Sequence, residues 1–404
     1  MNREEIYQQC VHKIDKTNCL LLQLPTGFGK TALSIHLVNH ILSQKHYRQT
    51  SSISILILVA KRVHKQTWAE EIQKWGGFHH PSARITTCME CYESLYKHQR
   101  ETFTIILADE VHHLGSEKRM NNFKNVLSDK IIGLSATIPR QINQFFRYNY
   151  HSETITSSLS EAIDAEILPT PTILLFPLHV ENSRMSETIE LNPKAKGPVY
   201  YGEYRDYWKY KRAKSHAILR CTQQQKLSEL NKLIEWYKKK TMQSSNPALR
   251  QTWLYFCGKR LEFFADCKLQ WVKLILHHLD KKRTITFCKT IAQAEQLGRN
   301  CIHSQNKDST AVYDSFNKKK INHITTVNIL NENANLVDCK YAIFANLSSS
   351  EICMPQRLGR SLRHKSPVII IPYYKSTREE EILKKYIEGF DKNYIKTIHS
   401  IQEI

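Results

Sequence analysis

The sequence lacks any apolar run long enough to cross a membrane, which takes roughly 18 consecutive residues in a helix. ISILILVA (53–60) is among the longest apolar runs, and its length suits a buried strand. The first ten residues, MNREEIYQQC, are charged and have no apolar core, so they are not a secretory signal. These absences exclude a membrane partner and predict a protein of the cytoplasm or, if it is viral, of the nucleoid or host cytoplasm.

A framework of zinc-binding cysteines is also missing. Of the eleven cysteines, only Cys88 and Cys91 form a CxxC pair, and no second pair lies at zinc-finger spacing. We interpret the cysteines as small buried residues in a reducing compartment. No internal repeat or low-complexity tract is present either.

Acidic residues are scarce relative to basic ones. Asp and Glu total 38 against 58 Lys and Arg, which gives a formal net charge of +20. Such an excess favours a polyanionic partner, and nucleic acid is the commonest one. A merely basic, soluble surface would give the same count, so the charge alone does not decide the partner.

The chain has 404 residues, which is too long for one compact core, so we expect two domains. Short apolar runs alternate with amphipathic stretches, a pattern typical of parallel sheets covered by helices. We therefore predict an α/β fold. The strand candidates are 19–24, 53–60, 103–109 and 130–136 in the first part of the chain and 284–288, 324–330, 341–347 and 367–374 in the second.

We expect two α/β units at 1–180 and 269–404, with a mainly helical, basic and aromatic insert at 181–268. Within the insert, YYGEYRDYWKYKRAKSHAILR (200–220) interleaves aromatic and basic residues. Aromatic rings stack on bases while cations neutralise phosphates, so the stretch is a candidate nucleic-acid surface. An amphipathic helix with a solvated basic face explains the composition equally well.

The stretch LPTGFGKT (24–31) lies between a predicted strand and a predicted helix. This context is the one that a phosphate-binding loop requires. Gly27 and Gly29 let the backbone curl so that its N–H groups face phosphate oxygens, aided by the helix N-terminus. Lys30 would contact the β- and γ-phosphates of ATP, and Thr31 would offer its hydroxyl to Mg²⁺. The residues that we expect to bind the nucleotide here are Thr26, Gly27, Phe28, Gly29, Lys30 and Thr31.

Two carboxylates follow a second apolar strand, in TIILADEVHH (104–113). Asp109 at the strand end can hold Mg²⁺ through water, and Glu110 can orient and deprotonate an attacking water. Two acids after a strand are by themselves often a solvated loop. Together with the lysine loop, they indicate hydrolysis of the γ-phosphate.

These motifs resemble those of the superfamily 2 helicases and translocases, and the resemblance covers both α/β units. LPTGFGKT is similar to motif I, with Leu24 where the pattern usually begins with glycine. Asp109-Glu110-Val111-His112 is similar to a DEAH-type motif II. The remaining matches in the first unit are Tyr7-Gln8, where the family's adenine-reading glutamine lies; LILVAKRVHKQTWAEEI (56–72), similar to motif Ia; and Ser135-Ala136-Thr137, similar to motif III.

The resemblance implies roles for these residues. Gln8 would read adenine, Lys61 and Arg62 would contact the phosphates of a nucleic-acid strand, and His112, Ser135 and Thr137 would couple the nucleotide site to that strand. FCKT (287–290) looks like motif IV, which makes Thr290 a further nucleic-acid contact.

QRLGRSLRH (356–364) resembles motif VI, and it carries the resemblance into the second unit. Arg360 and Arg363 are three residues apart and would share one helix face. There they would reach the γ-phosphate as arginine fingers, while Gln356 would help to place the water. Motif V departs from the family pattern, since Asn333 and Asn335 stand where the family usually has glycine and aspartate. Asparagine tolerates a left-handed backbone, so the turn itself can form.

The resemblance implies a motor with two RecA-like lobes, driven by ATP and Mg²⁺, that moves along nucleic acid. SLSEAIDAEILPTP (158–171) resembles a segment of the excision-repair and phage recombination helicases and of restriction-enzyme translocases, which favours DNA. Without a PD–(D/E)xK nuclease signature or room for a large domain before motif I, we expect a bare, monomeric motor with an insert. An RNA helicase and a nucleic-acid-binding ATP switch that barely hydrolyses ATP are the alternatives.

Overall fold

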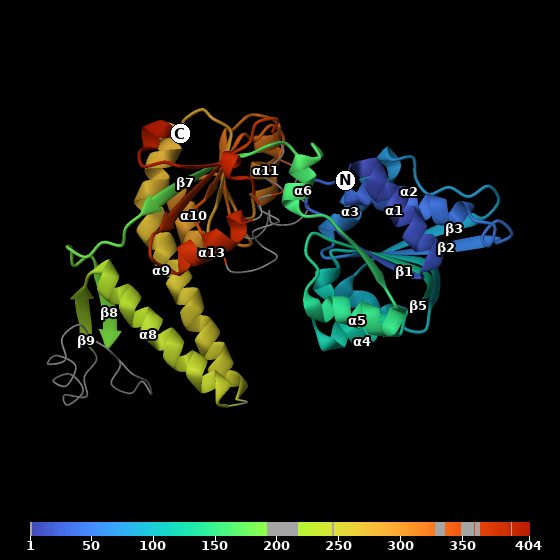
Figure 1. The fold of residues 1–404 in the computed structure, drawn as a ribbon, viewed down its shortest axis with the longest axis horizontal. Helices are drawn as coiled ribbons and strands as arrows, with labels where there is room; N and C mark the ends of the chain where they lie inside the picture. The colour runs from blue at the N-terminus through green and yellow to red at the C-terminus, as the bar shows by residue number, and fades with distance from the viewer. Residues whose placement is uncertain are drawn as a thin grey trace. The chain divides into compact units, whose positions relative to one another are not determined.

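The computed structural model describes residues 2–191, 217–244, 246–327, 336–348, 359, 364–388 and 390–404. The chain forms two compact units (Figure 1). Unit 1 comprises Met1–Pro171 with two short later segments, and unit 2 comprises Thr172–Leu330 with most of the remaining C-terminal residues. None of the helices in the described part of the chain combines the length and the apolar composition that crossing a membrane requires.

Unit 1 is built on a six-stranded sheet in the order β3-β2-β4-β5-β1-β6, and every neighbouring pair is parallel. β5 lies between β1 and β4, so the carboxyl ends of these three strands are adjacent on one edge. The strands are β1 (Cys19–Gln23), β2 (Ser52–Val59), β3 (Arg84–Cys91), β4 (Thr102–Asp109), β5 (Leu127–Ser135) and β6 (Glu153–Thr156).

Helices cover both faces of this sheet, which explains why its central strands are apolar on both sides. Figure 1 shows α1, α2 and α3 over one face and α4 and α5 over the other. At the centre, a Cβ on Gly133 of β5 would lie 2.6 Å from Leu21 Cδ2 and 2.9 Å from Val111 Cγ1, so a larger residue would force these buried side chains to shift. The helices are α1 (Arg3–Lys16), α2 (Lys30–Ser43), α3 (Val63–Lys74), α4 (Glu117–Lys124), α5 (Arg140–Tyr150) and α6 (Leu159–Asp164).

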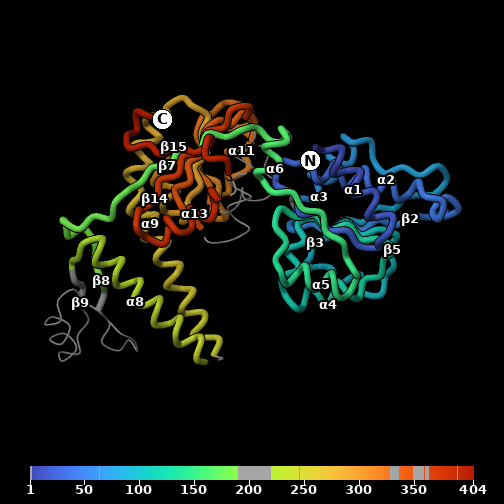
Figure 2. Tube along the Cα trace, viewed as in Figure 1, coloured from blue at the N-terminus to red at the C-terminus, as the bar shows by residue number. Residues whose placement is uncertain are grey.

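Unit 2 contains a seven-stranded parallel sheet in the order β11-β12-β10-β13-β14-β7-β15 (Figure 2). A separate antiparallel ribbon is formed by β8 (Glu187–Leu191) and β9 (Ala217–Cys221). Two parallel α/β sheets are the fold class that the sequence predicts, and that prediction is confirmed. The strands of the large sheet are β7 (Thr172–Leu178), β10 (Thr284–Phe287), β11 (Cys301–Ile302), β12 (His323–Thr326), β13 (Tyr341–Phe344), β14 (Val368–Tyr374) and β15 (Ile395–Thr397).

The boundary between the units differs from the expected one at residue 180. β7 pairs with β14 along its whole length, from Thr172 opposite Val368 to Leu178 opposite Tyr374, so it belongs to unit 2. This pairing joins strands almost 200 residues apart in sequence, and a local apolar pattern cannot indicate it. The expected insert at 181–268 is likewise part of unit 2 rather than a body of its own.

A long helical hairpin occupies much of that insert. It consists of α8 (Gln223–Met242) and α9 (Pro247–His278). Thr222 caps α8 through a capping box, and Asn246 caps α9 directly before Pro247. Phe263, Phe264, Val272 and Ile275 of α9 are buried in the core of unit 2.

A fully buried ion pair holds α9 against α13 (Arg378–Ile387). Lys268 Nζ lies 2.6 Å from Glu379 Oε1, and both side chains have no exposed surface. Glu379 Oε2 also accepts a hydrogen bond from Tyr374 N at 3.1 Å. Two further α-helices in the described part of unit 2 are α10 (Ile291–Leu297) and α11 (Ser309–Asn317).

Candidate nucleotide-binding site

Three of the sequence motifs meet at one edge of the unit 1 sheet. The loop 24–31 follows β1, Asp109 ends β4, and Ser135 ends β5, which lies between them. Leu24 N donates a hydrogen bond to Ser135 O at 3.1 Å, so the loop and the end of β5 are joined directly. In open α/β sheets, ligands bind at the carboxyl ends of the strands.

The loop has the backbone shape that its glycines predict. Gly27 and Gly29 have φ values of 93° and 100°, which L side chains rarely adopt. Gly29 is the N-cap of α2 and contributes no side-chain cap, so the helix begins with its N–H groups facing the loop. An ideal Cβ on Gly29 would meet nothing within 4 Å, so there is open space beside the loop at this point.

Lys30 and Thr26 line this loop. Lys30 Nζ donates hydrogen bonds to Leu24 O at 3.0 Å and to Pro25 O at 3.4 Å, so its ammonium group lies across the loop. The Thr26 hydroxyl is buried, and the described residues offer it no hydrogen bond. A buried hydroxyl of this kind fits a polar ligand in the loop.

Asp109 is buried and held by two aromatic residues. Trp68 Nε1 of α3 donates to Asp109 Oδ2 at 2.9 Å, and the Tyr92 hydroxyl donates to Asp109 O at 2.7 Å. Burial and the neighbouring carboxylate of Glu110 raise the pKa of Asp109 to about 6, while the bond from Trp68 and the charge of Lys30 lower it. Asp109 is therefore mostly ionised near neutral pH, although the margin is small.

Glu110 adopts a strained backbone and enters a hydrogen-bond network. Its φ and ψ of 53° and 56° are left-handed, a conformation that costs a non-glycine residue about 1–3 kcal/mol and clusters at functional sites. Ser135 Oγ lies 3.2 Å from Glu110 Oε2, 2.7 Å from Thr137 O and 3.0 Å from His112 Nδ1. Because a hydroxyl has one hydrogen, Ser135 can donate to Glu110 or to Thr137 O, but not to both at once.

A cavity of about 470 Å³ lies beside the loop, between α1, the start of α2 and the end of α3. The edge of the Tyr7 ring meets His36 with centroids 6.5 Å apart, and His36 meets Trp75 at 5.9 Å. Gln8, which the resemblance assigns to adenine, is exposed, donates to Glu4 Oε1 at 2.7 Å and does not line the cavity. The lining residues are Arg3, Glu4, Tyr7, Phe28, Gly29, Ala32, Leu33, His36 and Trp75.

The predicted nucleic-acid contacts lie next to α3 and at the start of α10. Lys61 and Arg62 are exposed and lie between β2 and α3. Thr290 caps α10, because its Oγ1 accepts a hydrogen bond from Gln293 N at 3.0 Å. The other predicted residues, namely Asn333, Asn335, Gln356, Arg360 and Arg363, lie outside the described residues.

Sequence reasoning did not identify several side chains that shape this site. Trp68 and Tyr92 contact Asp109 from α3 and from the 3-10 turn Tyr92–His98, and His36 and Trp75 line the cavity. Each looks like an ordinary core or surface aromatic in the sequence; only Trp68 lies within a motif, the stretch 56–72, and the resemblance gives it no role there. Their spacing to Asp109 or to the loop is set by the packing of helices on the sheet, which the sequence pattern does not give.

Comparison with known proteins adds to this geometry. Residues 2–140 match the family model described as the type III restriction enzyme, res subunit, and residues 267–365 match that of the helicase conserved C-terminal domain. No curated protein matches the chain. Among solved structures, Dbp5 of S. cerevisiae bound to RNA and ADP BeF3 is 12% identical, with 98% of this chain and 89% of that chain covered and a TM-score of 0.55. The helicase domain of Pyrococcus furiosus Hef is 16% identical, with 95% and 97% covered and a TM-score of 0.47.

The likeness to Dbp5 concerns the fold alone. The two family models match successive parts of the chain, in the order in which the motifs occur. The first of them fits the restriction-translocase branch that the segment 158–171 resembles. The chain therefore belongs to the superfamily 2 helicases and translocases and is a nucleotide-hydrolysing enzyme.

Proposed function

We propose that this chain is an ATP-driven motor that acts on DNA. The observation that supports it best is the convergence of the lysine loop, Asp109-Glu110 and Ser135 at the ends of adjacent strands. Two adjacent buried carboxylates, Asp109 and Glu110, are costly to maintain unless a cation and the charged ligand that carries it use them. Mg²⁺-ATP is such a ligand.

The residues around the loop fit a triphosphate. The backbone N–H groups at the start of α2 and the Thr26 hydroxyl would bind phosphate oxygens. Lys30 would exchange its bonds to the carbonyls of Leu24 and Pro25 for bonds to the β- and γ-phosphates. Thr31 and Asp109 offer the hard oxygen ligands that Mg²⁺ prefers, and the ion when bound supplies neutralisation of phosphate charge.

The base of the nucleotide would occupy the cavity of about 470 Å³ beside the loop. Gly29 lines this cavity and directly precedes Lys30 in the chain. A base bound in the cavity would therefore lie close to phosphates bound at the loop. Tyr7 and Trp75 offer apolar rings to the base there, whereas Gln8 is bonded to Glu4. In this reading the base is held mainly by ring packing.

Glu110 is the residue that would orient and deprotonate the attacking water. Its left-handed backbone and its contact with Ser135 fix the carboxylate near the end of β4. Movement of the Ser135 hydrogen between Glu110 and Thr137 would link the nucleotide site to the segment after β5. Arg360, Arg363 and Gln356 would complete the γ-phosphate site, as the resemblance implies.

DNA is favoured over RNA by the matched restriction-enzyme model and by the segment 158–171. Phosphate contacts alone do not distinguish the two, because they read neither sugar nor base. The test is ATP turnover by the purified chain with single-stranded DNA, duplex DNA or RNA. Stimulation by DNA above RNA supports the proposal, stimulation by RNA alone indicates an RNA helicase, and nucleic-acid binding with negligible turnover indicates an ATP switch.

A further inference from the structure

The distal half of the α8–α9 hairpin is separate from the core of unit 2. We call residues 235–259 the hairpin tip. Core residues of the hairpin, such as Leu227, Phe263 and Phe264, lie outside this range, and the core cluster contains no described residue of the tip. The tip packs on itself, with the rings of Tyr237 and Phe256 stacked at 5.3 Å. In Figure 1 the tip extends away from the sheet of unit 2.

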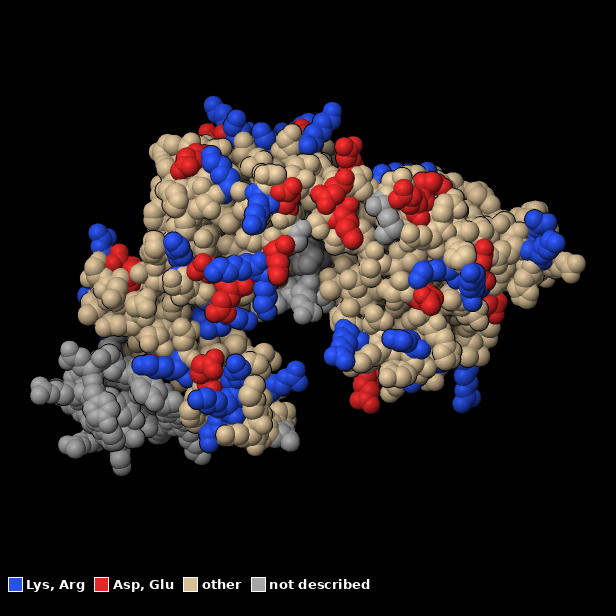
Figure 3. Space-filling view, in the orientation of Figure 1, with Lys and Arg blue, Asp and Glu red and all other residues tan. Residues whose placement is uncertain are grey.

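The hairpin tip is strongly basic. Its sequence contains five cations and one acid, Glu235. Two exposed contacts offset part of this charge: Glu235 lies 4.0 Å from Lys238, and Lys259 lies 2.8 Å from Glu262, just beyond the tip. Figure 3 shows Lys and Arg side chains gathered over this part of the hairpin. The cations are Lys238, Lys239, Lys240, Arg250 and Lys259.

Aromatic rings alternate with these cations. On α8, Lys240 lies over the Trp236 ring at 5.7 Å, and on α9, Lys259 lies over the Tyr255 ring at 5.5 Å. Each helix thus places an aromatic ring one turn before a lysine. Tyr255 is 58% exposed, although a ring of its size is ordinarily buried. Rings paired with cations can stack on bases while the cations contact phosphates.

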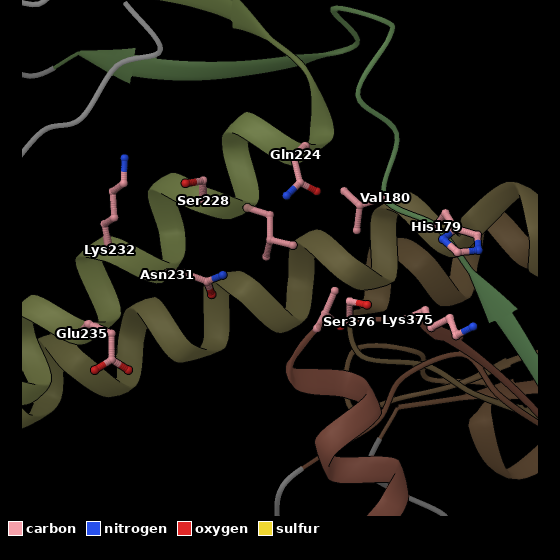
Figure 4. A pocket seen from close by; sticks show the side chains of 11 residues that line it. His179, Val180, Gln224, Ser228, Asn231, Lys232, Glu235, Lys375 and Ser376 are labelled. Atoms are coloured by element: carbon pink, nitrogen blue, oxygen red, sulfur yellow. The ribbon is translucent and has the colours of Figure 1, made fainter. Parts of the chain in front are cut away.

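A groove at the base of the hairpin carries charges of both signs. It has a volume of about 540 Å³ and lies between α8 and the turn after β14 (Figure 4). On the α8 side it is lined by Gln224, Ser228, Lys232 and Glu235, and Lys375 lies on the opposite side. Each further four-residue step turns by about 40° round an α-helix, so Trp236 and Lys240 lie progressively further round α8 from the groove.

We propose that the hairpin tip and this groove bind the phosphate backbone of nucleic acid, and that Trp236 and Tyr255 stack on unpaired bases. This inference rests on the proposed function, because that function supplies the nucleic acid that the surface would bind. It adds a second contact surface to the one that Lys61 and Arg62 would form. Charge complementarity selects the partner, since a surface with five cations and one acid suits a polyanion. The exposed Tyr255 ring and the half-buried Trp236 ring favour nucleic acid over an acidic polypeptide.

The chain offers a matched control for the test. Lys238, Lys239 and Lys240 form one run of three lysines, and Lys318–Lys320 form another in unit 2, directly after α11, with all three exposed. The two triple substitutions to glutamine, K238Q/K239Q/K240Q and K318Q/K319Q/K320Q, change the net charge equally. Binding of a labelled single strand would be measured by fluorescence anisotropy over a series of salt concentrations, with thermal unfolding as the check on folding.

We expect the hairpin variant to bind at least about tenfold more weakly than the control near 0.1 M salt. The slope of log K against log salt should fall by about 2, since each lost contact to a single strand contributes roughly 0.7. Equal affinities and slopes for the two triple variants would overturn the inference while leaving the motor proposal intact. A wild-type chain that binds no nucleic acid would instead overturn the motor proposal, and the inference with it.

Two further measurements bear on the partner and on stacking. Tyr255→Ala should weaken binding of a single strand more than binding of a duplex, because only unpaired bases can stack on the ring. An equal loss on both would overturn the stacking role. Polyglutamate and an unlabelled strand of equal charge would also be compared as competitors of the labelled strand. If polyglutamate displaces the labelled strand equally effectively, the partner is an acidic polypeptide and the assignment is overturned.

Discussion

Replacing Trp68 with phenylalanine should shift the pH dependence of ATP hydrolysis. The substitution keeps an aromatic ring in a buried position but removes the N–H that donates to Asp109 Oδ2 at 2.9 Å. A hydrogen bond to a charged group contributes roughly 1.5–3 kcal/mol, and this bond favours the ionised form of Asp109. Its loss corresponds to a rise of roughly 1–2 units in the pKa of the carboxyl group.

The expected change in ATP turnover depends on the pKa of Asp109 in the unsubstituted protein. Burial and Glu110 already raise the pKa of Asp109 to about 6, so the carboxyl group is roughly 90% ionised near pH 7. After the substitution we expect a pKa of roughly 7–8, which leaves about half to a tenth of the molecules ionised there. Only the ionised carboxylate can hold Mg²⁺. Turnover near pH 7 should therefore fall roughly two- to tenfold and recover as the pH rises towards about 9.

The assay is a pH profile of ATP turnover at subsaturating Mg²⁺, because bound Mg²⁺ would itself lower the pKa of Asp109. Trp271→Phe is the control, since Trp271 is a 40% exposed tryptophan on α9 in unit 2. The acid limb of the Trp68→Phe profile should move to higher pH, and that of the control should not. An unmoved acid limb, or a loss of turnover that is the same at every pH, would refute the role assigned to the Trp68 bond.

Two other substitutions test separate parts of the structure. Tyr7→Ala should raise the KM for ATP about tenfold while changing kcat little, because a ring-to-base contact contributes roughly 1–3 kcal/mol; an equal rise for inorganic triphosphate, which has no base, would count against the base site. Lys268→Met should lower the free energy of unfolding by about 3–5 kcal/mol in chemical denaturation, since it leaves the buried Glu379 carboxylate without its cation. A loss below about 1 kcal/mol would show that the ion pair does not stabilise the packing of α9 against α13.

The sequence predicts the strands of this fold well where burial is two-sided. The run 19–24 corresponds to β1 (Cys19–Gln23) and 103–109 to β4 (Thr102–Asp109), because strands covered on both faces are continuous apolar runs. β3 (Arg84–Cys91) has no continuous apolar run, so the sequence pattern does not predict it. It is an edge strand with mostly exposed or half-buried side chains, and backbone pairing with β2 defines it.

In the candidate site, too, local sequence patterns could be predicted and contacts made by packing could not. Motifs whose chemistry needs neighbouring residues, such as the loop 24–31 and Asp109-Glu110, are readable because their parts are adjacent in the chain. The contact between Trp68 and Asp109 joins residues 41 apart, and β7 joins its sheet through β14, so both depend on packing that no local pattern encodes. The adenine-reading role of Gln8 stays a prediction, and in the structure Gln8 donates to its own helix neighbour Glu4.

The most direct test of the central claim is ATP turnover by Glu110→Gln in the presence of DNA. Glu110→Gln keeps the size of the side chain and removes its capacity to accept a proton, so turnover should fall at least about 100-fold while ATP binding persists. Glu117→Gln, an exposed position in the first turn of α4, is the matched control and should hydrolyse ATP at the wild-type rate. Undiminished turnover by Glu110→Gln would contradict the account, because the carboxylate beside Asp109 would then have no part in hydrolysis.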